Sequence, residues 1–201
     1  MGRLEVSNLS LDVPGRHLLK EVSFEGEAGE CLAVMGPSGA GKTSLLNCLC
    51  GIAAPSGGSV WVDGVELTAL GPSKLADFRL RRIGMVFQFG ELLPELTTLE
   101  NVALPLRLLG SSRRDSERRA EEWLERLGLG GRGGMHPDML SGGEVQRAGI
   151  ARALAHEPRL VLADEPTGAL DEENTARIAG LLVGTAKELG ATVVVTTHDP
   201  L

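Results

Sequence analysis

The chain has 201 residues, and 42% of them are hydrophobic, which is enough for one buried core but hardly for two independent ones. Its formal net charge of -7 argues against the phosphate backbone of a nucleic acid as the main partner. The amino-terminal residues lack the apolar core of a signal peptide, and no window approaches the ~20 apolar residues that cross a bilayer, so we expect a soluble single domain with sub-lobes.

Short extended segments near the amino terminus predict a small antiparallel sheet. Residues 4–6 and 18–24 have the pattern of strands on either side of a turn at residues 13–16. Residues 60–62 form another extended stretch, which turns at Asp63-Gly64. We therefore expect an antiparallel β lobe made of about residues 1–30 and 58–70.

A glycine-rich loop follows the next apolar run, residues 31–35. The sequence Gly36-x4-Gly41-Lys42-Thr43 matches the phosphate-binding loop template in full, and helical character follows from Ser44. In such a loop backbone N–H groups and a helix amino terminus face the β-phosphate, the lysine neutralises β and γ oxygens, and the threonine hydroxyl reaches Mg²⁺. The residues predicted to bind a nucleoside triphosphate here are Gly36, Ser38, Gly39, Ala40, Gly41, Lys42, Thr43 and Ser44.

The hydrophobic period changes between residues 97 and 127. Ala120, Trp123, Leu124 and Leu127 follow the i, i+3, i+4, i+7 spacing of an amphipathic helix. Arg and Glu alternate on the other face, which favours a solvated surface over an RNA-binding one. The five glycines in residues 128–134 predict a flexible joint. We expect a helical subdomain over about residues 89–157.

Two apolar runs in the carboxyl-terminal part of the chain, residues 160–163 and 192–196, predict buried parallel strands. A helix over about residues 172–188 separates them. Together with residues 31–57, residues 158–201 are expected to form the nucleotide-binding core. The predicted fold class is therefore α/β, with a mostly parallel core sheet flanked by helices.

Polar residues follow these apolar runs, where a parallel sheet presents its ligand-binding edge. We predict that Asp164 holds Mg²⁺ and that Glu165 orients or deprotonates the attacking water. Gln88, after the apolar run at residues 83–87, could contact Mg²⁺ or water, and His198 would lie beside the γ-phosphate. Alone, two acids after a strand more often form a solvated turn or a helix cap, but the preceding phosphate loop favours the catalytic interpretation.

The segment after the predicted joint carries a family resemblance that covers essentially the whole chain. Leu140-Ser141-Gly142-Gly143-Glu144-Val145-Gln146-Arg147 resembles the signature of ABC (ATP-binding cassette) proteins, which other phosphate-loop enzymes do not share. The resemblance implies the ABC-cassette form of the P-loop NTPase fold, with ATP and Mg²⁺ as its ligands. It also implies that Gln88 is the Q-loop glutamine, Asp171 the D-loop aspartate and His198 the switch histidine that touches the γ-phosphate.

In this family two cassettes pair head to tail, so that the signature of one copy covers the phosphates bound by the other. Ser141, Gly142 and Gly143 suit this role, because they offer a hydroxyl, backbone donors and a helix amino terminus to an anion. The resemblance therefore implies an ATPase that works as a homodimer.

Residues 87–102 and 164–171 are similar to one branch of the family, the lipoprotein-release, macrolide-export and cell-division ATPases. The branch implies a transmembrane permease partner with few membrane spans and a large extracytoplasmic part, which the cassette drives for export or extrusion. The chain would then be cytoplasmic and peripheral on the inner face of the cell membrane. Reduced thiols at Cys31, Cys48 and Cys50 fit such a compartment.

Two features depart from the family pattern. Where relatives have an aromatic side chain that stacks on adenine, this chain has Val13, and the planar groups nearby belong to Arg16 and His17. The chain ends at Leu201, soon after His198, where relatives continue with a further strand and helices. A trimmed form and a natural short form are both open.

Other kinds of cassette fit the sequence less well. DNA-repair and chromosome ATPases insert a long coiled coil between loop and signature, for which residues 43–140 leave no room, and ribosome-associated relatives carry two cassettes in one chain. A degenerate cassette that only binds nucleotide is disfavoured, because Lys42, Asp164, Glu165 and His198 are all present. An active transporter ATPase is the function that the sequence predicts.

Overall fold

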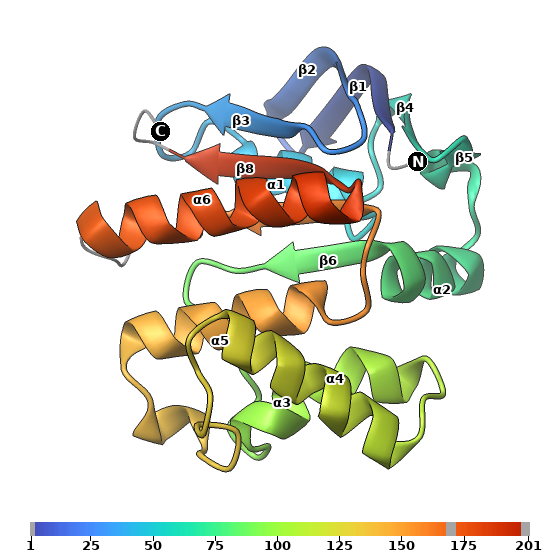
Figure 1. Ribbon diagram of the computed structural model, residues 1–201. Coiled ribbons are helices and arrows are strands. Elements are labelled where there is room, and N and C mark those ends of the chain that lie inside the picture. The colour runs from blue at the N-terminus through green and yellow to red at the C-terminus, as the bar shows by residue number, and fades with distance from the viewer. Residues whose placement is uncertain (1–2, 168–171, 198–201) are drawn as a thin grey trace.

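The computed structural model describes residues 3–167 and 172–197. The chain forms two four-stranded sheets and a group of helices that lies beyond β6, away from the amino-terminal hairpin (Figure 1). The strands are β1 (Leu4–Val13), β2 (Arg16–Gly26), β3 (Cys31–Met35), β4 (Gly57–Val62), β5 (Val65–Glu66), β6 (Ile83–Val86), β7 (Leu160–Asp164) and β8 (Thr192–Thr197). The α-helices are α1 (Lys42–Leu49), α2 (Pro72–Arg82), α3 (Thr98–Leu108), α4 (Arg113–Arg126), α5 (Gly142–Leu154) and α6 (Glu172–Leu189), and short 3₁₀ turns cover Leu67–Ala69 and Pro137–Met139.

The first sheet is antiparallel, with the strand order β2-β1-β4-β5. The sequence predicted its place in the chain, but not the length of its hairpin, because β1 and β2 continue almost to the turn at Pro14-Gly15. Irregular pairing interrupts the apolar-polar alternation there, and Asn8 and Glu21 adopt positive φ angles of 50° and 48°. These bulges hide the strand pattern in the middle of the hairpin.

The second sheet is parallel, with the order β3-β8-β7-β6. Its register aligns the carboxyl ends of the strands, since Met35 pairs with Thr197, Asp164 with Thr196, and Val86 with Ala163. Both predicted apolar runs are central strands of this sheet, and β8 is buried along its whole length. The segments that follow β3, β6, β7 and β8 therefore start from one edge of the sheet.

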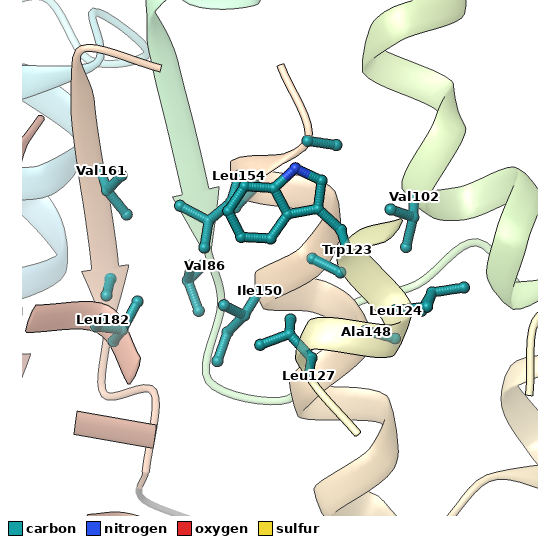
Figure 2. Close-up of a cluster of buried hydrophobic side chains, with 14 of the residues drawn as sticks. Val86, Val102, Trp123, Leu124, Leu127, Ala148, Ile150, Leu154, Val161 and Leu182 are labelled. Atoms are coloured by element: carbon teal, nitrogen blue, oxygen red, sulfur yellow. The ribbon is translucent and has the colours of Figure 1, made fainter. Parts of the chain in front are cut away.

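Alternate residues of β7 enter two different cores, as the period of a strand requires. Leu160 and Leu162 pack with α1 and the antiparallel sheet, whereas Val161 and Ala163 pack with α5, α6 and the helical group. In the second core, Trp123 lies among Val86, Ile150 and Leu154 (Figure 2). The parallel sheet is thus fixed by apolar contacts on both faces.

The helical group consists of α3, α4 and α5 (Figure 1). The predicted apolar face of α4 is confirmed, because Ala120, Trp123 and Leu124 are buried, as is Leu127 at the end of this helix. The prediction of a flexible joint after α4 is wrong. Its backbone is folded onto α3, with the Leu99 N–H donating to the Gly133 carbonyl at 2.9 Å, because glycines allow this close turn.

Within the described residues, no helix combines the length and the apolar character needed to cross a membrane. The boundaries between the lobes stay a prediction from the sequence.

Candidate nucleotide-binding site

The predicted phosphate loop links β3 to α1, and its last glycine is required by the structure. Gly41 caps α1 with a φ of 92°, a left-handed conformation that other residues rarely adopt. A Cβ atom at Gly41 would lie 2.8 Å from the Leu18 carbonyl oxygen of β2. The loop can therefore pack directly against the antiparallel sheet only with glycine at this position.

Lys42 points back across the loop that precedes it. Its ammonium group donates to the carbonyl oxygens of Gly36 at 2.7 Å and of Pro37 at 3.2 Å. Lys42 Nζ also lies 3.2 Å from Glu165 Oε1, and only 7% of the lysine side chain is exposed. The loop, its cation and the carboxylate after β7 are therefore in direct contact.

Asp164 is held by two hydroxyl groups from different parts of the chain. Thr43 Oγ1 donates to Asp164 Oδ2 at 2.7 Å, and Thr196 Oγ1 donates to Asp164 Oδ1 at 2.6 Å. The Glu165 N–H donates to Thr196 Oγ1 at 3.1 Å. One threonine on β8 thus holds the Asp164 carboxylate and the backbone of Glu165.

Thr196 was not singled out from the sequence. The signal was weak but present, since Thr196 is the first polar residue after Val193-Val194-Val195, just before the end of a buried strand.

Glu165 has an unusual backbone conformation, with a positive φ of 41°. Such conformations cluster at functional sites.

The oxygen atoms around Asp164 fit Mg²⁺, which prefers carboxylate, hydroxyl and amide oxygens together with water and phosphate. Thr43, Gln88 and Asp164 all line the same cavity. Among the described residues no group of three or more His, Cys, Asp or Glu side chains could hold a metal ion, so an ion here would rely on water and phosphate oxygens as well.

A cavity of about 460 Å³ unites most of the predicted nucleotide ligands. Its lining residues are Arg16, Leu18, Ser38, Gly39, Gly41, Lys42, Thr43, Ser44, Gln88, Asp164 and Glu165. Gly36 and Ala40 belong to the loop without lining the cavity, and Val13 is outside the lining as well. His198 and Asp171 lie outside the described residues, so their roles stay predictions from the sequence.

The predicted signature is not part of this cavity. Ser141 is the N-cap of α5 and forms a capping box with Glu144, with the Ser141 N–H donating to Glu144 Oε2 at 2.9 Å. Hydrogen bonds from the N–H and the hydroxyl of Ser141 lower the pKa of Glu144. Ser141 and Gly142 are exposed, Gly143 is half-buried, and a Cβ atom at Gly142 would meet nothing within 4 Å.

The signature helix is nevertheless tied to the loop that carries Gln88. Gln146 Nε2 donates to the Phe87 carbonyl at 3.0 Å, and Arg152 Nη2 donates to the Gly90 carbonyl at 3.0 Å. At Gly149 the two backbones meet, because a Cβ atom there would lie 2.8 Å from the Gly90 Cα. The sequence reasoning missed this contact, for which the small residue Gly149 on a buried helix face is the only signal.

The family model described as "ABC transporter" matches residues 19–168. The chain is 46% identical to the lipoprotein-releasing system ATP-binding protein LolD of Chromohalobacter salexigens, over 91% of this chain and 77% of that protein. It is also 44% identical to the methionine import ATP-binding protein MetN of Carboxydothermus hydrogenoformans, over 96% of this chain and 58% of that protein.

Among solved structures, a similar one is the dimeric post-hydrolysis form of the ATP-binding cassette MJ0796 bound to ADP and Pi. Its TM-score is 0.89 at 38% identity, covering 98% of this chain and 88% of that one. A second dimeric structure of MJ0796, described as a bacterial ABC transporter cassette, matches with the same TM-score of 0.89.

Proposed function

Because this chain belongs to the ABC transporter family, and is thus the ATP-hydrolysing subunit of a transporter, we propose that it cleaves ATP between two head-to-tail copies and drives a separate permease. One observation carries the paired arrangement. The phosphate loop and the carboxylates line one cavity, whereas Ser141 and Gly142 are exposed outside it. The amino terminus of α5 can therefore serve as an anion site for ATP bound by another copy.

In this proposal the residues of the cavity divide the chemistry among them. Lys42 exchanges its contacts with the loop carbonyls and Glu165 for the β and γ oxygens of ATP. Glu165 then accepts a hydrogen bond from water and takes its proton as the water oxygen attacks the γ-phosphorus. The bond between the γ-phosphorus and the bridging oxygen breaks, which leaves ADP and inorganic phosphate.

Thr43, Gln88 and Asp164 would hold Mg²⁺, which when bound neutralises charge on the phosphate oxygens. Thr196 keeps Asp164 in place through its 2.6 Å hydrogen bond. His198 and Asp171 are assigned by resemblance alone, His198 to the γ-phosphate and Asp171 to the interface between copies.

We place the permease contact at a groove of about 370 Å³ between the parallel sheet and the helical group. Its lining includes Phe87, which precedes Gln88, and Glu91 in the same loop, together with Leu104 of α3. A segment seated there would touch the backbone that carries Gln88, so movement at the γ-phosphate would reach the membrane partner. Arg79 and Arg152 at this groove favour a partner segment with apolar and acidic side chains.

A photo-reactive amino acid at Leu104 tests this contact in membranes of the source cell. Cross-linking to an integral membrane protein is expected from Leu104 and not from Leu108, which lies on the same helix, is 64% exposed and is outside the groove. Cross-linking from Leu108 alone would place the permease elsewhere.

For the transport task, we favour extrusion or lipoprotein release over import. Relatives of both kinds match at similar identity, so the preference rests on residues 87–102 and 164–171 and their similarity to the lipoprotein-release branch. A permease partner would also hold the chain at the inner face of the cell membrane.

The dependence of ATPase activity on protein concentration tests the paired site. If each site needs two copies, activity per milligram rises with concentration below the dimer dissociation constant and then becomes constant. Chelation of Mg²⁺ should abolish it at all concentrations. Activity per milligram that does not change across a hundredfold dilution, down to nanomolar protein, would contradict the paired site.

A further inference from the structure

The antiparallel sheet forms one wall of the nucleotide cavity, and among the described residues this wall has no aromatic side chain. β2 contributes Arg16 and Leu18 to the lining. The chain has four Phe, two Trp and no Tyr, all within the described residues, and none of these rings lines the cavity. A planar group that could stack on a nucleotide base must therefore come from another residue type.

Arg16 has the required position and shape. Its Nη2 donates to the carbonyl oxygen of Gly39 at 2.8 Å, which fixes the side chain against the phosphate loop. That hydrogen bond uses the edge of the guanidinium group and leaves its faces open for stacking. Arginine planes stack on the bases of nucleic acids in the same manner.

Successive residues of the hairpin strands point to opposite faces of the sheet, which separates the neighbours of Arg16 into two groups. His17 points to the other face, where its Nδ1 lies 2.6 Å from Asp12 Oδ1 and 81% of its side chain is exposed. Val13 is the direct cross-strand partner of Arg16, on the same face of the hairpin, and is 39% exposed. Of the two planar groups near Val13, only Arg16 faces the cavity.

We propose that Arg16, with Val13 beside it, forms the platform for the base, so that the site selects the polyphosphate and Mg²⁺ rather than adenine. Stacking recognises the flat face that every base has, and it reads no hydrogen-bonding edge. The substrate class is then purine and pyrimidine nucleoside triphosphates in general. This inference rests on the proposed nucleotide site and adds to it the identity of the base contact.

Calorimetric titration of the full chain with ADP, GDP, CDP and inorganic pyrophosphate tests the platform without hydrolysis. The three nucleotides are expected to bind the native chain within about fivefold of one another. Arg16→Ala should weaken all three by about two- to fivefold, the size of an exposed cation–π contact, and leave pyrophosphate unchanged. Arg16→Lys keeps the charge without the plane and should behave like Arg16→Ala.

Arg16→Tyr introduces an aromatic ring and should tighten ADP and GDP more than CDP, because purines present more area for stacking. His17→Ala, on the other face of the same strand, is the control and should leave all four affinities unchanged. The platform is overturned if ADP binds the native chain more than about thirtyfold tighter than GDP and CDP. It is also overturned if Arg16→Ala weakens pyrophosphate as much as ADP, or weakens neither.

If neither the nucleotides nor pyrophosphate bind the native chain, the nucleotide site itself is wrong, which is a different outcome from the loss of the base platform alone.

Discussion

The phosphate loop and the signature both present hydroxyl groups and a helix amino terminus. Among the described residues, other segments of the chain contact these groups only at the phosphate loop. At the phosphate loop, Thr43 and Thr196 bring hydroxyl groups from distant segments onto Asp164, at 2.7 Å and 2.6 Å. At the signature, the hydroxyl of Ser141 bonds Glu144, a neighbour on its own helix, at 2.8 Å. The first region is completed by contacts between distant segments of the chain. Ser141 and Gly142 of the second region are exposed, and in the proposed pair ATP bound by another copy would reach them there.

The largest effect is expected at Glu165, the carboxylate that contacts Lys42 of the phosphate loop. Glu165→Gln removes the general base and should lower kcat by about 10²- to 10⁴-fold, while ATP still binds. With ATP retained, the variant should also accumulate as a dimer, which light scattering measures. Glu157→Gln is a matched control, because Glu157 also has a positive φ of 53° but lies outside the cavity. Turnover by Glu165→Gln within tenfold of the native rate would remove Glu165 from the base role.

Ser141→Arg tests the outward-facing region. The bulky cation should prevent the paired state and lower ATPase activity at least tenfold, with ATP affinity of the single copy unchanged. Loss of the cap alone costs about 1 kcal/mol of stability. Ser112→Arg controls for that cost, because Ser112 caps α4 in the same way, accepting from the Asp115 N–H at 3.1 Å, and lies outside the signature. An ATP-dependent dimer of Ser141→Arg would contradict the paired site.

Thr196→Val tests the long-range contacts of the first region. Removing the hydroxyl that holds Asp164 should raise the Mg²⁺ concentration needed for half-maximal activity by about 10- to 100-fold. Thr192→Val, at the other end of β8, removes the hydrogen bond to the Glu27 carbonyl and should affect stability alone. An unchanged Mg²⁺ requirement in Thr196→Val would mean that Asp164 does not depend on this threonine.

The smallest effect concerns the contact between the signature helix α5 and the loop that carries Gln88. Gly149→Ala places a methyl group against the Gly90 backbone and should lower the free energy of unfolding by about 1–3 kcal/mol. The control is Gly180→Ala, where a Cβ atom meets nothing within 4 Å, and it should stabilise α6 by up to about 1 kcal/mol. Urea denaturation measures both. If the two alanines behave alike, the helix of the signature is not packed tightly on the Gln88 loop.

The same contrast explains what the sequence could predict. The phosphate loop, the strand before Asp164 and the apolar face of α4 are local patterns, and the structure has each of them where the sequence predicted. Thr196, Gln146 and Arg152 act through partners far away in the chain. No spacing in the sequence points to the roles of Gln146 and Arg152, and the place of Thr196 near the end of a buried strand is only a weak signal. The flexible joint predicted for the glycines after α4 is wrong for the same reason, because backbone contacts with α3 hold this segment.

A thiol cross-link between copies tests the paired site most directly. One variant carries Ser38→Cys in the phosphate loop, another carries Ser141→Cys in the signature, and both carry Glu165→Gln to hold ATP. After mixing, a short bifunctional maleimide should link the two variants to each other when ATP and Mg²⁺ are present, and much less with ADP. The absence of any ATP-dependent link between the two variants would contradict the claim that ATP is held between two copies.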